Sequence, residues 1–215
     1  MDYLNLNKKL WNDRTIVHVN SEFYNNETFL KGKNSLNEIE LNLLGNVRGK
    51  SILHLQCHFG QDSISLARLG AKVTAVDFSE KAIETAIALN KKSGTDCKFI
   101  CSDVYSLATV LDQKFDIIFT SYGVIGWLPD MQKWANLIAS FLKPGGVFVI
   151  AEFHPAVWMF DNDFKYVQYS YFKSEPIIET EEGTYADKDA KINTTSVTWN
   201  HSLSEVMSSL LNSGL

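Results

Sequence analysis

The sequence contains few of the features that mark secreted or membrane proteins. Its three cysteines are odd in number and have no C-x-x-C spacing, so we expect neither a disulfide framework nor a cysteine-based zinc site. No uncharged run approaches the roughly 20 residues that span a bilayer. No apolar stretch follows a basic segment at the N-terminus. These features predict a cytoplasmic protein with reduced thiols and no membrane partner.

Cationic residues are also in deficit, with 20 Lys and Arg against 25 Asp and Glu and a formal charge of -5. This balance does not predict the broad basic face that binds nucleic-acid phosphates. We therefore expect a small-molecule partner and no nucleic acid. The 215 residues are 45% hydrophobic, which is enough for one sizeable core, and we expect a single domain over 1–215.

Residues 50–154 alternate β-prone runs with helical patterns, which is typical of a parallel sheet built from βαβ units. Ser79 is the predicted cap of a helix whose apolar residues share one face. The predicted strands are Ser51–Cys57, Lys72–Asp77, Cys97–Cys101, Phe115–Thr120 and Gly146–Phe153, with further helices at about Asp62–Leu69 and from Pro129. The expected fold class is α/β, a Rossmann-like, mostly parallel sheet with flanking helices.

The two ends of the chain depart from this alternation. Residues 1–45 carry scattered aromatic side chains and a capping box at Ser35 to Glu38, which predicts a helical N-terminal cap with a helix running toward Leu44. A second capping box, at Ser202 to Glu205, predicts a last amphipathic helix over residues 202–214.

Residues 155–200 are aromatic and rich in turn residues. The runs Tyr166–Phe172 and Thr194–Trp199 are β-prone, and no helical period is present. This pattern predicts an antiparallel β insertion after the fifth strand.

Ligands of parallel α/β sheets bind beyond the carboxyl ends of the strands. Asp77 ends the second strand, where a carboxylate can accept hydrogen bonds from both ribose hydroxyls of a nucleotide. The loop after the first strand leads into a helix N-terminus, whose free N–H groups favour a negatively charged group. The candidate ligand-binding residues are Gln56, His58, Gly60, Asp62, Asp77, Phe78, Asp103, Val104 and Ser121. The structural alternatives are a turn glycine at Gly60, a helix cap at Asp77 and an ordinary loop residue at Asp103.

The order of these features resembles that of the class I S-adenosylmethionine-dependent methyltransferases over about residues 50–154. The motifs that carry the resemblance are Val76–Ser79, Phe115–Ile118 and Lys143–Gly146. The resemblance implies S-adenosylmethionine as the cofactor, with its ribose at Asp77 and its adenine at Asp103 and Val104.

The glycine loop departs from the family pattern. The usual acidic residue followed by alternating glycines is replaced by His54-Leu-Gln-Cys-His-Phe-Gly60, in which only the last glycine is kept. By the resemblance, Gly60 and its neighbours hold the methionine part. The loop looks like that of a bacterial subgroup of the family.

Candidate acceptor-side residues follow the fifth strand and lie in both flanking regions. Glu152 and His154 are two residues apart and point to the same side of a strand, so either is a candidate base, with a ligand-free strand-end carboxylate and a hydrogen-bonded loop histidine as the alternatives. The candidate substrate or lid residues are Trp11, His18, Tyr24, Tyr122, Trp127, Trp199 and His201, with ordinary packing as the alternative for each. No metal site is expected, because the His54 to His58 spacing spans a strand and a turn.

The sequence therefore predicts methyl transfer to a small molecule. The alternative from another class is a catalytically silent S-adenosylmethionine sensor or partner-binding module, which the degenerate glycine loop suggests. A nicotinamide dehydrogenase is disfavoured, because G-x-G-x-x-G does not follow the first strand. In the family, a further pair of strands follows the last helix, so we expect missing C-terminal strands. The fifth strand then needs covering by the insertion, by the last helix or by a second copy in a homodimer.

Overall fold

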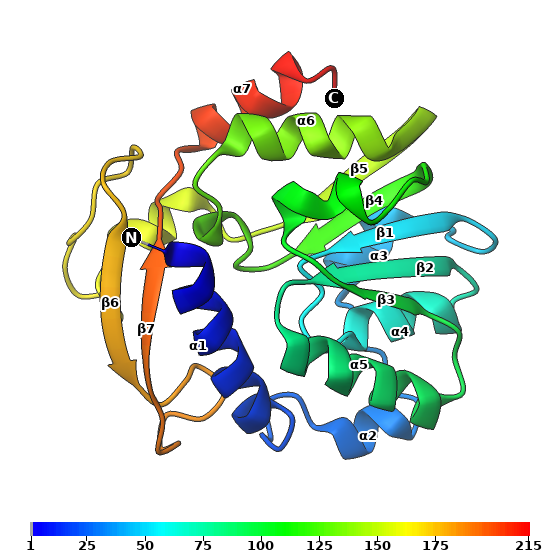
Figure 1. Cartoon of the computed structure of the whole chain (residues 1–215), viewed down its shortest axis with the longest axis horizontal. Coiled ribbons are helices and arrows are strands. Elements are labelled where there is room, and N and C mark those ends of the chain that lie inside the picture. Colours follow the sequence, from blue (N-terminus) through cyan, green and yellow to red (C-terminus); the bar gives the residue numbers. More distant parts are fainter. Residues whose placement is uncertain (1) are drawn as a thin grey trace.

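The computed structural model describes residues 2–215 and contains the expected parallel sheet (Figure 1). Its five strands lie in the order β3-β2-β1-β4-β5, and every neighbouring pair is parallel. Their bounds are β1 Ser51–Leu55, β2 Lys72–Asp77, β3 Lys98–Cys101, β4 Phe115–Ser121 and β5 Leu142–Ala151. The α/β, Rossmann-like fold class is confirmed.

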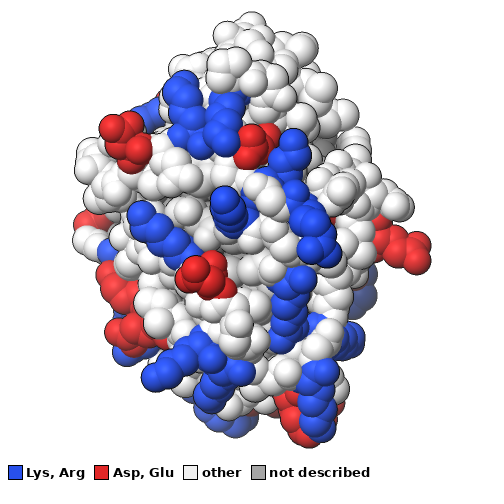
Figure 2. Space-filling model, turned by 90° about the vertical axis from the view of Figure 1, so that its right-hand side faces the viewer, with Lys and Arg blue, Asp and Glu red and all other residues white. Residues whose placement is uncertain are grey.

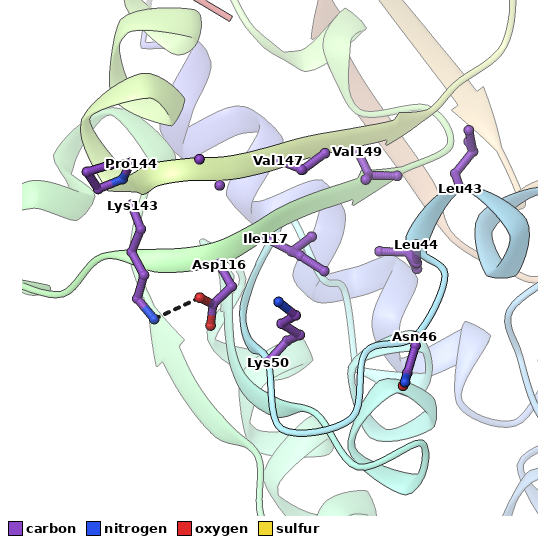
Figure 3. A pocket seen from close by; sticks show the side chains of 12 residues that line it. Leu43, Leu44, Asn46, Lys50, Asp116, Ile117, Lys143, Pro144, Val147 and Val149 are labelled. Atoms are coloured by element: carbon purple, nitrogen blue, oxygen red, sulfur yellow. Dashed lines mark hydrogen bonds and ion pairs between the residues drawn. The ribbon is translucent and has the colours of Figure 1, made fainter.

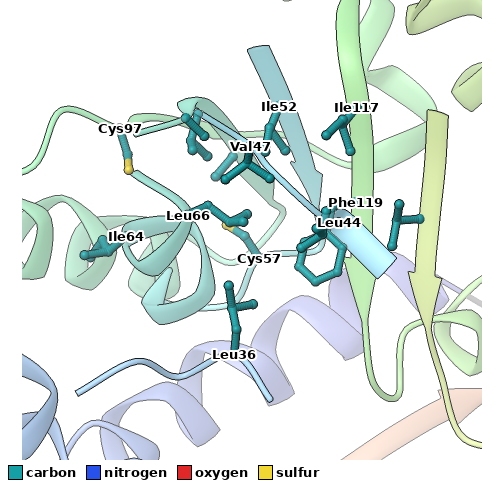
Figure 4. Packing of buried hydrophobic residues seen from close by; sticks show 14 of the residues in the cluster. Leu36, Leu44, Val47, Ile52, Cys57, Ile64, Leu66, Cys97, Ile117 and Phe119 are labelled. Atoms are coloured by element: carbon teal, nitrogen blue, oxygen red, sulfur yellow. The ribbon is translucent and has the colours of Figure 1, made fainter. Parts of the chain in front are cut away.

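Helices cover both faces of the sheet (Figure 1). On one side lie α4 (Gln61–Arg68) and α5 (Glu80–Ser93), together with α2 (Asn26–Leu30) and α3 (Glu38–Leu44), and on the other lie α6 (Met131–Phe141) and α7 (Leu203–Asn212). Short 3-10 helices η1 (Val104–Thr109), η2 (Ile125–Trp127) and η3 (Pro155–Met159) follow β3, β4 and β5. The sheet thus separates two apolar cores. Figure 4 shows part of the first, where Leu44 lies beside Phe119, and Leu36 and Ile52 belong to the same cluster.

Side-chain caps set three of the helix starts, and the caps at Ser79 and Ser202 are as predicted. Ser79 accepts a hydrogen bond from the Ala82 amide, and Asp130 accepts one from Lys133 at the start of α6. Ser202 accepts from the Glu205 amide and so begins α7. Each oxygen satisfies an amide that has no partner within its helix.

The predicted capping box at Ser35 is wrong. Helix α3 begins at Glu38 after Asn37, and no side chain caps it. The Ser35 hydroxyl instead lies 2.9 Å from the Ser65 hydroxyl of α4. The Ser35 oxygen, which the local pattern predicts as the cap of α3, is therefore used in a hydrogen bond to another helix.

The N-terminal cap is dominated by one helix, α1 (Tyr3–His18), which packs along the two-stranded sheet of the insertion (Figure 1). Asn7 fixes this contact twice: its amide nitrogen donates to the Val197 carbonyl at 2.7 Å, and its oxygen accepts from the Val197 amide at 2.8 Å. Helix α1 is therefore held against the insertion by two hydrogen bonds from one side chain to the backbone of β7.

The insertion contains an antiparallel pair, β6 (Ile177–Glu182) and β7 (Asn193–Thr198), so one of its two predicted strands is confirmed. The run Tyr166–Phe172 is not a strand, and only Val167 makes an isolated bridge, to Phe160. Asp161 accepts hydrogen bonds from two amides at the start of this run, which holds a turn there. Its aromatic side chains are largely exposed, so no second face stabilises extended pairing.

Candidate functional site

The loop after β1 has an unusual backbone. Gln56 (φ 54°), His58 (φ 50°) and Gly60 (φ 81°) are all in the left-handed region, which ends the strand at Leu55, two residues before the prediction. For a residue with a side chain this conformation costs roughly 1–2 kcal/mol. At Gly60 glycine is required, because an added Cβ would lie 2.7 Å from the Phe99 ring. The loop therefore has a backbone conformation that favours glycine, but two of its left-handed positions carry the polar side chains of Gln56 and His58.

Asp77 joins the loops after β1 and β2. It is buried, and its two oxygens accept hydrogen bonds from the His58 amide at 2.8 Å and the Ser79 amide at 2.9 Å. Burial raises the pKa of Asp77 to about 6, although these amide hydrogen bonds favour its charged form. The helix cap of α5 is Ser79, so Asp77 acts as a bridge between two loops.

A small pocket lies at the carboxyl ends of the strands, directly beside Asp77. It has a volume of about 40 Å³, because α1 lies across it. Its lining residues come from α1 (Tyr3, Leu4 and Asn7) and from the loops after the strands (Gln56, Val76, Asp77, Phe78, Ser102, Asp103, Val104, Tyr105, Trp127 and Leu128). The pocket thus brings together six of the residues that the sequence singled out.

Other candidates lie close by without lining this pocket. Asp62 and Ser121 contact each other, with the Ser121 hydroxyl 3.2 Å from an Asp62 oxygen. Burial raises the pKa of Asp62. His58 points toward α1, and Gly60 is the N-cap of α4 without a side-chain cap. The first amides of α4 therefore have no capping oxygen from Gly60.

A polar aromatic cluster joins α1, the following turn, the loop after β1 and the insertion. His18 Nδ1 lies 2.8 Å from His58 Nε2, and the Tyr24 and Tyr185 hydroxyls are 2.5 Å apart. Burial lowers the pKa of His18 to about 3 and that of His58 well below its usual value, so both rings are neutral at pH 7. Trp11 packs between His58 and Trp127, with ring centroids 5.2 Å away in each case.

Sequence reasoning missed Tyr185 and Arg14 in this region. Arg14 of α1 is almost fully buried and contacts Glu181 of β6 at 3.3 Å, and its guanidinium lies 5.7 Å from the Trp11 ring. Tyr185 is 167 positions from His18 and lies in a turn of the insertion. No local pattern indicates either contact, because both depend on how the insertion folds back onto α1.

The candidate bases lie beyond the end of β5 at Ala151, and each has its own hydrogen-bond partners. The Glu152 carboxylate accepts hydrogen bonds from the amides of Gly123 at 2.6 Å, Val124 at 2.8 Å and Phe153 at 2.8 Å. His154 is exposed, and its Nδ1 accepts from the Ala156 amide at 3.2 Å. Glu152 thus holds the loop after β4, and His154 caps η3.

The remaining candidates are mainly packed as structural residues. Trp199 is buried against Tyr3, with ring centroids 5.1 Å apart. His201 is buried, and its Nε2 lies 2.7 Å from the Leu128 carbonyl. Tyr122 (φ 44°) is exposed beside Phe153.

The opposite edge of the sheet has a different chemistry. A cavity of about 260 Å³ lies there between α3 and β5, and Figure 3 shows its apolar side chains beside Lys50 and the Lys143–Asp116 ion pair of 3.0 Å. None of the residues predicted for the ligand site lines it.

Lys and Arg gather on this edge (Figure 2), although the net charge did not predict a basic face. Parallel strands all begin at the same edge, so the cations that precede or open them are brought together. The exposed ones are Arg48, Lys50, Lys72, Lys98 and Lys114. A formal charge of -5 therefore coexists with a local group of exposed cations on this edge.

Two features are absent from residues 2–215. No group of three or more His, Cys, Asp or Glu side chains in this range could hold a metal ion. Within the same range, no helix is both long enough and apolar enough to cross a membrane.

Comparisons with known proteins agree with this geometry. Residues 52–146 match a family model described as a methyltransferase domain. The ubiquinone biosynthesis O-methyltransferase of Coxiella burnetii is 35% identical over 100 residues, which cover 46% of this chain and 42% of that protein. The enzyme of the same name from Bordetella avium is 28% identical over 59% of this chain and 54% of its own length. The chain thus spans about half the length of these curated relatives.

Solved structures share the fold over most of the chain. An S-adenosylmethionine-dependent methyltransferase from Clostridium acetobutylicum matches with a TM-score of 0.62 at 17% identity, covering 92% of this chain and 82% of that one. The protein DhpI, solved as a complex with SAH, matches with a TM-score of 0.62 at 19% identity, covering 98% and 87%. The match to the methyltransferase domain thus covers residues 52–146, somewhat less than half of the chain, and the solved structures show that the fold is shared over most of its length.

Proposed function

We propose that this protein binds S-adenosylmethionine at the carboxyl ends of β1, β2 and β3 and transfers its methyl group to a small molecule. The observation that carries the proposal is the pocket in which Asp77 lies between Gln56 on one side and Asp103 with Val104 on the other. A buried carboxylate beside an apolar wall suits a ribose next to an adenine ring. The family match and the solved relatives support the same cofactor.

The proposed residue roles follow the order of the strands. Asp77 accepts hydrogen bonds from the ribose, while Asp103 and Val104, after β3, bond and pack the adenine. The N-terminus of α4, where Gly60 supplies no capping side chain, faces the carboxylate of the methionine part. Phe78 and Trp127 add apolar walls. Asp62 and Ser121 support the loops around this end through their mutual hydrogen bond.

Methyl transfer from a sulfonium is an in-line displacement, in which positioning of the acceptor contributes most and a base is optional. We assign the positioning to a lid formed by α1 and the turn after it, with Trp11, His18 and Tyr24 on its inner side. These side chains contact His58 of the cofactor loop. The neutral imidazoles of His18 and His58 can form hydrogen bonds with the small molecule that accepts the methyl group, without adding a charge to the site. The name of the curated relatives favours a hydroxyl acceptor.

Calorimetric titration with S-adenosylmethionine and S-adenosylhomocysteine, followed by a methyl-transfer screen over hydroxyl-bearing small molecules, tests the proposal. We expect both ligands to bind and at least one acceptor to be methylated. Lys50→Ala, at the opposite edge of the sheet, is the matched control and should bind like the wild type. Absence of binding by the wild type would refute the proposal.

A second candidate is a silent sensor that binds the cofactor without turnover. The loop after β1 favours it, because Gln56 and His58 stand at left-handed positions where the family pattern has glycines. Binding without transfer to any acceptor in the screen would select this alternative.

We also propose a cytoplasmic location and self-association. The three cysteines are unpaired, as expected in a reducing compartment. Among the described strands β5 pairs only with β4, and Val147 on it is 54% exposed. A second copy can cover such an edge. Light scattering of the purified chain measures this directly: a dimer is expected, and a monomer at all concentrations would contradict it.

A further inference from the structure

Arg14 is a buried cation whose charge is only partly compensated. It lies in the last turns of α1, and its side chain is 8% exposed. Its ion-pair partner among the described residues is Glu181 of β6, with Nη2 3.3 Å from a carboxylate oxygen. Burial lowers the pKa of Arg14, because the charged form loses its hydration. A buried guanidinium with one long contact is costly, so its position calls for a further anionic partner.

The shape of the guanidinium indicates what kind of partner it can take. Nε and Nη2 donate toward the same side of the group and form a fork that matches the two oxygens of a carboxylate. In Arg14 half of this fork is used: Nη2 contacts Glu181, while the buried Nε has no hydrogen-bond partner within residues 2–215. The other oxygen of Glu181 accepts from Asn162 at 2.5 Å, so this carboxylate is shared with the insertion. Arg14 therefore keeps an open donor for a second planar anion.

The neighbours of Arg14 connect it with the cofactor pocket. Its guanidinium lies 5.7 Å from the centre of the Trp11 ring, and Trp11 packs against Trp127, which lines that pocket. Tyr185 is also close, because the Arg14 charge opposes the rise in pKa that burial causes at the Tyr185 hydroxyl. A ligand that contacts Trp11 would therefore lie within reach of both the cofactor pocket and Arg14.

We infer that Arg14 binds a carboxylate group of the methyl acceptor, so that the acceptor is a hydroxy acid. This inference rests on the proposed function and narrows its substrate class. The carboxylate would accept from Nε and Nη2, and Nη2 would give up its long contact with Glu181. In the transfer, the oxygen–methyl bond forms as the sulfur–methyl bond breaks, sulfur keeps the electron pair, and the hydroxyl proton is released to water.

The experiment compares hydroxybenzoates and lactate with their primary amides, in which a neutral group replaces the carboxylate. Calorimetry on protein saturated with S-adenosylhomocysteine gives the affinities, and a methyl-transfer assay gives kcat and KM. We expect at least one acid to bind and to be methylated. Its amide should bind about tenfold more weakly or worse, the range for a hydrogen bond to a charged group. An amide that binds as tightly as its acid, or no binding of any acid, would overturn the inference.

Two variants of the ion pair should act in opposite directions. Arg14→Gln should weaken acid binding about tenfold or more, raise KM, and leave the affinities for the amide and for S-adenosylhomocysteine unchanged. Glu181→Gln removes the competing anion, so it should bind the acid more tightly than the wild type. A purely structural ion pair would lower the melting temperature in both variants and would change acid binding in neither, and this result would overturn the inference.

Arg14→Lys is a further variant in case Arg14→Gln does not fold, because it keeps the charge beside Glu181 but has no fork. It should recover only part of the acid affinity. Acid affinity equal to that of the wild type would contradict recognition by the fork. A wild type that binds S-adenosylhomocysteine but methylates only neutral alcohols would overturn the inference and leave the proposed function standing. A wild type that does not bind the cofactor would overturn both.

Discussion

The polar groups at the two edges of the parallel sheet differ in their burial and in their hydrogen bonding. At the carboxyl edge, Asp77 is buried and bonded to two loop amides, and the loop after β1 carries two left-handed side chains, Gln56 and His58, each with a buried atom that has no partner among the described residues. At the amino edge, the lysines that open the strands are exposed, and Lys143 is paired with Asp116. Buried, strained and incompletely bonded groups mark ligand chemistry, whereas solvated charges do not. The smaller pocket is therefore the better candidate, although the cavity at the amino edge is larger.

The pH dependence of stability tests the burial of Asp77. Its pKa is about 6 in the folded protein, above the ordinary 3.8, so the folded state holds the proton more tightly. The contribution of Asp77 to stability is therefore fully present below about pH 4 and is lost, by about 3 kcal/mol in all, as the pH rises through 6. Denaturant unfolding at several pH values, with Asp77→Asn as the reference, measures this slope. Parallel pH profiles for the two proteins would show that Asp77 is solvated.

The second prediction concerns affinity at the same residue. Asp77→Ala should weaken S-adenosylhomocysteine binding by about 1.5–3 kcal/mol, because the ribose hydroxyls lose a charged acceptor. Calorimetric titration gives the value, and Lys50→Ala is the control at the other edge. Unchanged affinity in the Asp77 variant would place the nucleotide elsewhere.

The contact between α1 and the insertion gives a smaller effect. Asn7→Ala removes both hydrogen bonds to Val197 and leaves two buried backbone groups unpaired, so unfolding should become easier by about 1–3 kcal/mol. Urea denaturation provides the free energy. Lys9→Ala is a comparison on the same helix at an exposed contact with Asp13, and a loss in Asn7→Ala no larger than in this variant would contradict the assigned role.

The smallest effect is expected at the amino edge. Lys72→Ala and Lys98→Ala should change stability by less than about 0.5 kcal/mol, since both side chains are exposed. Their cofactor affinity should equal that of the wild type. A clear loss of cofactor affinity in either variant would contradict the claim that the amino edge takes no part in binding.

Local patterns predicted the central sheet well, because each βαβ unit carries its own strand, helix and cap. The Ser79 and Ser202 caps and the position of Asp77 follow from a few adjacent residues. Such patterns could not predict contacts between segments that are distant in the sequence. The Ser35 hydroxyl is bonded to α4, and the first insertion strand lies at Ile177–Glu182 instead of Tyr166–Phe172.

The site shows the same division. The pocket includes Gln56, Asp77 and Asp103, which the sequence placed there from strand ends alone. The sequence could not show that Glu152 would be bonded to three loop amides, or that Tyr185 would contact Tyr24 and His18. These contacts depend on loop conformation and on the docking of the insertion.

Amide hydrogen exchange with and without S-adenosylhomocysteine tests most directly whether ligand chemistry is confined to the carboxyl edge. The account predicts added protection in the loops after β1, β2 and β3 and across residues 11–29 of the lid. It predicts no change at residues 46–50 and 143–147 of the amino edge. Protection centred on the amino edge, or binding without protection in the three loops, would contradict the account.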